Sequence, residues 1–203
     1  MTQSALARQP RRVRTQLPTS PGGLILVGGP PFQGKSVLAA HLADILPLSH
    51  KLEVVDNLRS GDAEHWLPQG TDGRPKLRPL PTMIDAAVRV WLRNTPRPVV
   101  IVAARAATPS ARRLVQRRAA AAGMKFLFVE SRSHAIRAFA RLSAMSLPKE
   151  ELIRVMKRYD QAVAQFVPVD RIEMKTLPVV RLNMVLSDVD EAARTVLARW
   201  ATL

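Results

Sequence analysis

An eight-residue motif restricts the fold of this chain more than any other part of its sequence. Residues 29–36 read GPPFQGKS and fit the pattern G-x-x-x-x-G-K-[S/T] without a mismatch. The apolar run 24–27 before the motif predicts a buried strand, and residues 37–46 after it carry apolar side chains at helical spacing. A strand, a glycine-rich turn and a helix in this order are typical of a loop that binds phosphate groups.

Each part of the motif has a physical role in binding a nucleoside triphosphate. The backbone N–H groups of residues 32–36 would surround the β-phosphate and add to the positive N-terminal end of the following helix. Lys35 would bridge the β- and γ-phosphates, and the Ser36 hydroxyl would coordinate Mg²⁺. We therefore predict that ATP and Mg²⁺ bind here, and the expected nucleotide-binding residues are Gly29, Phe32, Gln33, Gly34, Lys35 and Ser36.

Predicted strands and predicted helices alternate along the rest of the chain. Strands are expected at residues 52–56, 99–104, 125–130 and 179–186. Helices are expected at residues 82–93, 110–122, 131–145, 148–166 and 188–200. This alternation predicts crossover connections and therefore a parallel sheet with helices on both faces, in a single domain of residues 22–203.

Composition excludes several other classes of protein. The chain has 203 residues and no cysteine, so it contains no disulfide, no thiol nucleophile and no thiolate metal site. Its four histidines lack the close spacing of metal ligands. No apolar run approaches the roughly 20 residues of a transmembrane helix. We expect a cytoplasmic protein with no membrane partner.

The chain is strongly basic, with 31 Lys and Arg against 16 Asp and Glu and a net charge of +15. Arginine binds phosphate in a bidentate manner, so its prevalence suits an anionic partner such as nucleic acid; a genome rich in G and C is the other explanation. Between residues 86 and 129 there is no acid, which suits a solvated basic surface or a track for a polyanion. The basic residues there are Arg89, Arg93, Arg97, Arg105, Arg112, Arg113, Arg117, Arg118 and Lys125.

Residues 1–21 differ from the rest of the chain. They contain Arg8, Arg11, Arg12 and Arg14, three prolines, no acid and no periodic apolar pattern. This composition predicts a disordered basic arm, and it also resembles a mitochondrial transit peptide.

The motif and three further segments resemble the small P-loop kinases, a group that contains polynucleotide kinases, zeta-toxin-like kinases and the kinase domain of the phosphofructokinase-2 enzymes. Residues 100–113 are similar to the third strand and next helix of that family. Residues 126–131 are similar to its fourth strand, and residues 156–160 to the helix after its lid. The resemblance covers residues 24–187 and implies a three-layer α/β P-loop domain with a five-stranded parallel sheet in the order 2-3-1-4-5.

The resemblance also implies an activity, the transfer of the ATP γ-phosphate to a hydroxyl group. It implies a lid at about residues 131–150, in which Arg132 would bind the nucleotide and Arg137 and Arg141 would act in catalysis with Lys35. A polynucleotide 5′ end or a phosphorylated metabolite is the kind of anionic acceptor that suits the basic surface.

One position departs from the family pattern. Where those kinases have an aspartate at the end of the third strand, which holds the water shell of Mg²⁺, this chain has Ala103 and Ala104. Asp56 follows the predicted second strand, and ligands of doubly wound sheets bind beyond such strand ends. Asp56 is therefore the candidate both for the metal and for catalysis at the acceptor hydroxyl. A turn formed with Asn57 is the other interpretation of this residue.

Two further functions stay open beside the kinase. A nucleotide-binding module with weak turnover fits the loss of the third-strand aspartate. An ATPase stimulated by nucleic acid fits the basic surface.

Overall fold

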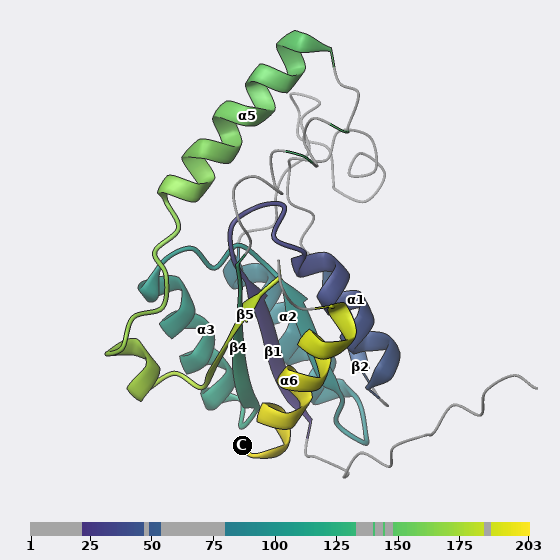
Figure 1. Ribbon diagram of the computed structural model, residues 1–203. Helices are drawn as coiled ribbons and strands as arrows, with labels where there is room; N and C mark the ends of the chain where they lie inside the picture. Colours follow the sequence, from purple (N-terminus) through teal and green to yellow (C-terminus); the bar gives the residue numbers. More distant parts are fainter. Residues whose placement is uncertain are drawn as a thin grey trace, which may run out of the picture.

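The computed structural model describes residues 22–46, 49–53, 80–132, 140, 144, 148–184 and 188–203 (Figure 1). Its strands are β1 (Gly23–Gly28), β2 (Ser49–Glu53), β3 (Val99–Ala103), β4 (Lys125–Arg132) and β5 (Val179–Asn183). Its helices are α1 (Lys35–Ile45), α2 (Leu80–Arg93), α3 (Pro109–Ala121), α5 (Lys149–Ala164) and α6 (Val189–Ala201), with a short 3-10 helix η1 (Glu173–Lys175).

The strands form one sheet in the order β2-β3-β1-β4-β5, and every adjacent pair is parallel. This is the strand order that the resemblance implied, and the α/β class predicted from the alternation of elements is confirmed. β1 is the central strand, and its Gly23 is opposite Val99 of β3 on one side and Lys125 of β4 on the other. The loop that follows β1 therefore begins at the middle of the carboxyl edge of the sheet.

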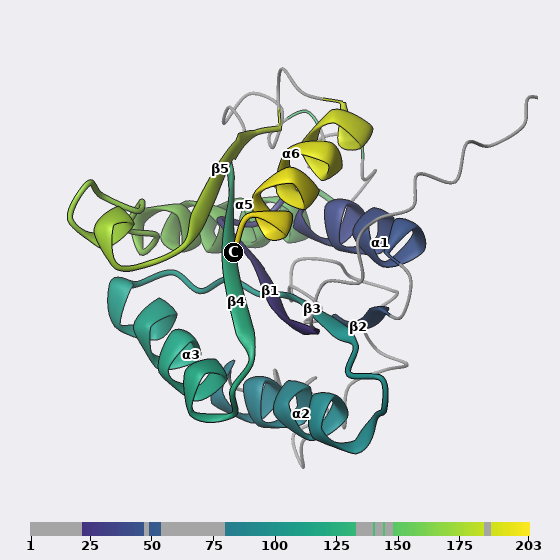
Figure 2. The same cartoon turned by 90° about the horizontal axis from the view of Figure 1, so that it is seen from below.

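Helices cover both faces of the sheet. Figure 2 shows α2 and α3 on one face and α1 and α6 on the other. Leu24 and Leu26 of β1 belong to the core cluster under α2 and α3, whereas Ile25 and Val27 belong to the cluster under α1 and α6. Successive side chains of a strand point to opposite faces, so a strand buried on both sides is apolar throughout. This is why β1 has no polar side chain.

Helix α5 stands apart from these layers. In Figure 1 it rises above the carboxyl ends of the strands and projects away from the sheet. A small apolar cluster of its own joins Val155 and Tyr159 of α5 with Phe32 of the loop after β1. No helix in the part of the chain that the structure describes is long and apolar enough to cross a bilayer.

Several boundaries differ from the predictions made from sequence, and two of these differences have a clear cause in strand pairing. The second strand is Ser49–Glu53 rather than 52–56, because backbone pairing with the whole of β3, from Val99 to Ala103, determines its length. A helix was predicted from residue 131, but Ser131 and Arg132 continue β4, where they pair with Leu182 and Asn183 of β5. The predicted arm 1–21 and most of the predicted lid lie outside the described residues.

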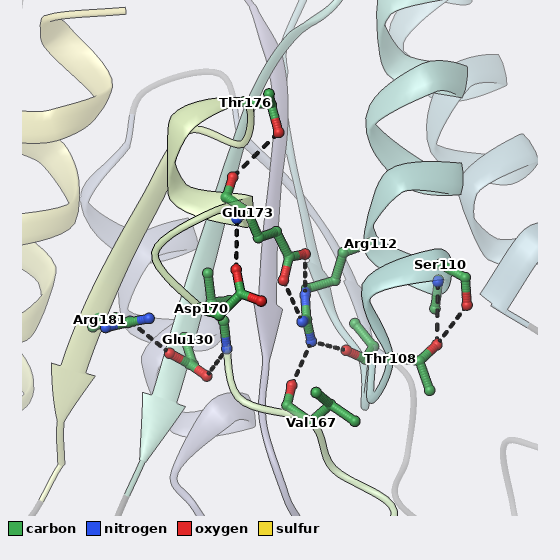
Figure 3. A network of polar contacts seen from close by, with 12 residues as sticks. Thr108, Ser110, Arg112, Glu130, Val167, Asp170, Glu173, Thr176 and Arg181 are labelled. Atoms are coloured by element: carbon green, nitrogen blue, oxygen red, sulfur yellow. Dashed lines mark hydrogen bonds and ion pairs between the residues drawn. The ribbon is translucent and has the colours of Figure 1, made fainter.

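Arg112 does not belong to a basic surface. Its side chain is fully buried, and its Nε and Nη2 atoms donate to the two carboxylate oxygens of Glu173 at 2.7 and 2.6 Å (Figure 3). Nη1 donates to the carbonyl oxygens of Ala106 and Val167 at 3.2 and 2.9 Å. A buried charge needs such partners, and this pair joins α3 to η1. Arg112 was predicted to belong to the basic surface or track, but it is a core residue.

Candidate functional site

The loop between β1 and α1 has the backbone conformation that its glycines permit. Gly29 and Gly34 have φ angles of 148° and 76°, and Phe32 also lies in the left-handed region at 57°. A Cβ atom on Gly29 would come within 2.3 Å of the Ser131 carbonyl oxygen. The loop therefore packs against the end of β4 at a distance that only glycine allows.

The N-terminus of α1 has no side-chain cap from its N-cap residue. Gly34 is the N-cap residue and has no side chain, and the first turn contains no acid. The first helical hydrogen bond runs from the Leu38 N–H to the Gly34 carbonyl, so the N–H groups before Leu38 have no partner within the helix. A phosphate group satisfies such donors and is favoured by the helix dipole.

Lys35 reaches back across the loop. It is the first residue of α1 and is only 4% exposed, and its Nζ donates to the Pro30 carbonyl oxygen at 2.7 Å. The side chain thus spans the loop from its end to its beginning and holds an ammonium group beside the open helix N-terminus. Backbone donors and a fixed cation in one place are suited to a polyphosphate.

Residues of two other strands hold the loop in place. The Ser131 hydroxyl at the end of β4 donates to the Gln33 carbonyl oxygen, and the Gly29 N–H donates to the Arg105 carbonyl after β3 at 3.4 Å. The Gln33 side chain is buried, and its Oε1 has no hydrogen-bond partner among the described residues. An unsatisfied buried acceptor is costly, and a donor of a bound ligand is one group that can satisfy it.

Phe32 connects the loop to α5. Its ring lies 6.1 Å from the Tyr159 ring, centroid to centroid, at an interplanar angle of 52°. The tilted arrangement is a favourable one for an aromatic pair. Burial, with a smaller contribution from the Asp160 carboxylate, raises the pKa of Tyr159. The Phe32–Tyr159 contact therefore packs the loop against α5.

The carboxyl end of β3 carries no acid. Ala103 and Ala104 are both buried there, and the Ala104 N–H bonds to the Val27 carbonyl oxygen at 2.9 Å. Asp56, which the sequence offers as a substitute, lies outside the described residues, so its role stays a prediction. Among the described residues no three His, Asp or Glu side chains are grouped to hold a metal ion. Of the two predicted metal ligands, the described part of the site thus contains Ser36 alone.

Glu130 is an acid near the loop that the sequence reasoning missed. It pairs in register with Gly28, the last residue of β1, and is fully buried. Its carboxylate accepts from the Val169 N–H at 2.9 Å and forms an ion pair with Arg181 at 3.1 Å (Figure 3). A second ion pair joins it to Arg132 at 3.0 Å. These partners make it a structural carboxylate. An acid inside an otherwise apolar strand was the available signal, since a buried carboxylate requires such neighbours.

Of the three arginines predicted for the lid, the structure describes Arg132. Arg132 is the last residue of β4 rather than part of a lid, and its guanidinium is paired with Glu130. Arg137 and Arg141 lie outside the described residues. The role of all three toward a nucleotide stays a prediction.

Solved structures resemble most of the chain. A sugar kinase from Janibacter sp. HTCC2649 has a TM-score of 0.56 at 16% identity, over 88% of this chain and 94% of that one. Kti12 from Chaetomium thermophilum, solved with ADP-AlF3, has a TM-score of 0.57 at 15% identity, over 87% and 96%. The APS kinase CysC of Mycobacterium tuberculosis, solved with AMPPNP and APS, has a TM-score of 0.55 at 20% identity, over 89% and 98%.

No protein-family model and no curated protein matches the sequence. At identities of 15–20% the structural matches show the fold alone, and they span most of both chains rather than the loop only. In this chain the five strands are parallel, and the glycine-rich loop follows the central strand. The chain has the fold of the P-loop kinases.

Proposed function

We propose that this protein is a kinase that transfers the γ-phosphate of ATP to a hydroxyl group of an anionic acceptor. The observation that carries the proposal is the loop itself, where buried Lys35 spans the loop to Pro30 beside the uncapped N-terminus of α1. The sugar kinase, and the nucleotide analogues solved with Kti12 and with the APS kinase, support it.

In the proposed reaction, each residue of the site has a separate role in phosphoryl transfer. The loop N–H groups and Lys35 hold the β- and γ-phosphates, so that the γ-phosphorus faces the acceptor. The acceptor oxygen forms a bond to the γ-phosphorus while the bond to the β–γ bridging oxygen breaks and ADP leaves. Asp56 takes the proton of the acceptor hydroxyl, and Arg132, Arg137 and Arg141 offset the negative charge that develops.

A magnesium ion fits the chemistry of the loop. Mg²⁺ is commonly bound by one or two protein oxygens together with water and substrate phosphates, so it does not need a cluster of acids. Ser36, in the first turn of α1, supplies the hydroxyl ligand, and Asp56 is the second proposed ligand. When bound, the ion would neutralise charge on the β- and γ-phosphates.

A transfer assay with ATP labelled at the γ-phosphate tests the proposal. Acceptors with a phosphate group near a free hydroxyl, including 5′-hydroxyl oligonucleotides and phosphorylated sugars, are incubated with the protein and Mg²⁺. We expect label on one acceptor class and equimolar ADP. Label released only as free phosphate would identify an ATPase instead.

Asp56→Asn should lower the rate of transfer by a factor of about 100 to 10,000, because the amide cannot accept the acceptor proton. The affinity for ATP in the absence of Mg²⁺ should stay within about twofold, since the loop holds the phosphates. Single-turnover rates and ATP titration separate the two quantities. Asp62→Asn is the matched control in the same segment, and equal loss in both variants would contradict a specific role for Asp56.

Tyr159→Ala should weaken ATP binding by roughly 3- to 10-fold, because the lost ring contact is worth about 0.5–1.5 kcal/mol and no longer holds Phe32 in the loop. Tyr159→Phe keeps the ring and should bind ATP as the unmodified protein does. Isothermal titration with ATP measures both, and Val163→Ala, an exposed position of the same helix, is the control. Unchanged affinity in Tyr159→Ala would show that α5 does not support the loop.

A nucleotide-binding module with weak turnover is the second candidate function. The buried alanines at the end of β3, Ala103 and Ala104, favour it because they leave that strand without an acidic metal ligand. ATP binding with normal affinity but no ADP release, with any acceptor, would select this candidate over the kinase.

A further inference from the structure

Five exposed arginines lie on α2, on α3 and directly after α2, and we call them the α2–α3 arginine surface: Arg89, Arg93, Arg97, Arg113 and Arg117. The two helices pack against each other on the same face of the sheet (Figure 2). The sole acid from residue 80 to residue 129 is Asp85, and it is already paired with Arg118. Within residues 80–132, no other acid before Glu130 is therefore available to neutralise the five arginines.

The structure separates these arginines from the basic residues that have structural partners. Arg112 is buried against Glu173, Arg118 is bound to Asp85, and Arg105 donates to Gln165. In contrast, Arg89, Arg93, Arg113 and Arg117 have no ion-pair partner among the described residues. Arg97 is held with its guanidinium 4.1 Å from the centre of the Trp91 ring. Toward the described residues, these arginines form a basic surface without acidic partners.

The other described helices are not basic in this way. Helix α6 carries Asp190 and Glu191 beside Arg194 and Arg199, and α5 has both Glu150 and Glu151 in its first turn. A genome that favours arginine codons would raise arginine everywhere, but it would not remove acids from one face. The uneven distribution therefore points to a partner of that face.

We infer that the α2–α3 arginine surface binds the phosphate backbone of a nucleic acid duplex. Arg89 and Arg93, like Arg113 and Arg117, are four residues apart and form two rows about 6 Å in spacing along their helices. Arginine binds phosphate oxygens in a bidentate manner, so such rows suit a regular array of phosphates.

The side chains of this face favour a duplex over other polyanions. Trp91 is the sole aromatic residue of the two helices and is buried, so no ring is offered for base stacking, as a protein that binds single strands requires. An anionic membrane would need several exposed apolar groups, and Leu92 is the one large exposed apolar side chain of α2 and α3. Contacts to phosphates alone predict binding without base-sequence preference.

This surface is distinct from the nucleotide site. The helix α1, which follows the loop, covers the opposite face of the sheet, and α2 runs from the carboxyl edge back to the start of β3. Arg89 and Arg93, in its second half, therefore lie toward the amino edge, away from the loop. The inference goes beyond the proposed function and does not rest on it.

The test measures binding of the full chain to a labelled 20-base-pair DNA duplex and a matching RNA duplex over a series of salt concentrations. Each phosphate contact contributes about −0.9 to the slope of log K against log salt. The pair Arg89→Ala with Arg93→Ala should reduce the magnitude of this slope by about 2 and weaken binding roughly 10-fold or more at 0.1 M salt. The pair Arg113→Ala with Arg117→Ala should do the same.

The matched control is Arg194→Ala with Arg199→Ala on α6, which removes the same charge from the opposite face of the sheet. It should leave the affinity within about twofold. Equal loss in the α6 pair would show a net-charge effect, and unchanged binding in both test pairs would place the interaction elsewhere; either result overturns the inference. So would binding to phosphatidylserine vesicles, but not to duplexes, that depends on the same arginines.

Two variants distinguish this inference from the proposed function. Lys35→Ala should bind duplexes normally, whereas the α2 and α3 pairs should bind ATP normally. Loss of transfer activity with intact duplex binding would thus affect the kinase proposal alone.

Discussion

Lys35→Ala should weaken ATP binding by about 100-fold and leave no measurable phosphoryl transfer. Charge-assisted hydrogen bonds contribute about 1.5–3 kcal/mol, and Lys35 is buried beside the position where the phosphates would bind. The remaining N–H groups of the loop would still attract phosphate, so weak binding should persist. Calorimetric titration with ATP and Mg²⁺ measures the affinity, and γ-phosphate transfer measures the activity.

Lys175→Ala is the control for Lys35→Ala, because it removes the same charge from an exposed residue of η1. Its affinity for ATP should equal that of the unmodified protein. Thermal unfolding of both variants shows whether they are folded. A folded Lys35→Ala protein with normal ATP affinity would refute the loop as the nucleotide site.

Glu173→Ala should lower the free energy of unfolding by about 3–5 kcal/mol. The substitution leaves the Arg112 guanidinium buried with two carbonyl oxygens but without a counter-charge, and burial of an unpaired charge is among the most costly changes in a protein core. Urea denaturation measures the loss as a lower midpoint at a similar slope.

The Arg112–Glu173 pair also allows a test in which stability should be regained. Replacing both partners, Arg112→Met with Glu173→Leu, should recover most of the lost stability, because apolar residues of similar volume can replace a buried ion pair. The exposed carboxylate of Glu191 on α6 gives the control, and Glu191→Ala should cost less than about 1 kcal/mol. A loss below about 1 kcal/mol in Glu173→Ala would contradict a stabilising role for Glu173.

The fold could be predicted because its signals are local. Residues 24–27 and 99–104 are apolar throughout, which only a strand buried on both faces requires, and the intervening helical patterns force crossover connections. The end of β4 could not be predicted in this way. Ser131 and Arg132 are polar, and they are extended because β5 pairs with them across the sheet.

The loop between β1 and α1 was predictable for a similar reason, since its signal lies in consecutive residues; phosphate binding by this loop stays a prediction. The supports of the loop were not predictable, because Ser131 and Tyr159 are about 100 residues or more from Gln33 and Phe32 and meet them only in the folded chain.

The burial of Arg112 could have been inferred from its spacing to the apolar residues of α3, although its charge suggested a surface position. Arg112, Val115 and Ala119 are three and four residues apart and form the buried face of α3. Charge alone placed this arginine in a basic surface, and the periodicity of the buried positions was not used to predict its burial.

The bare N-terminus of α1 has a consequence for how the protein responds to its ligand. Gly34 provides no side chain to complete the helix, so under the proposed function a bound phosphate would serve as the missing cap. Ligand and fold then stabilise each other, and at a concentration 100 times its dissociation constant the nucleotide should add about 2.7 kcal/mol to stability. The melting temperature of the unlabelled protein, measured at increasing ATP concentration, should therefore report occupancy of the site.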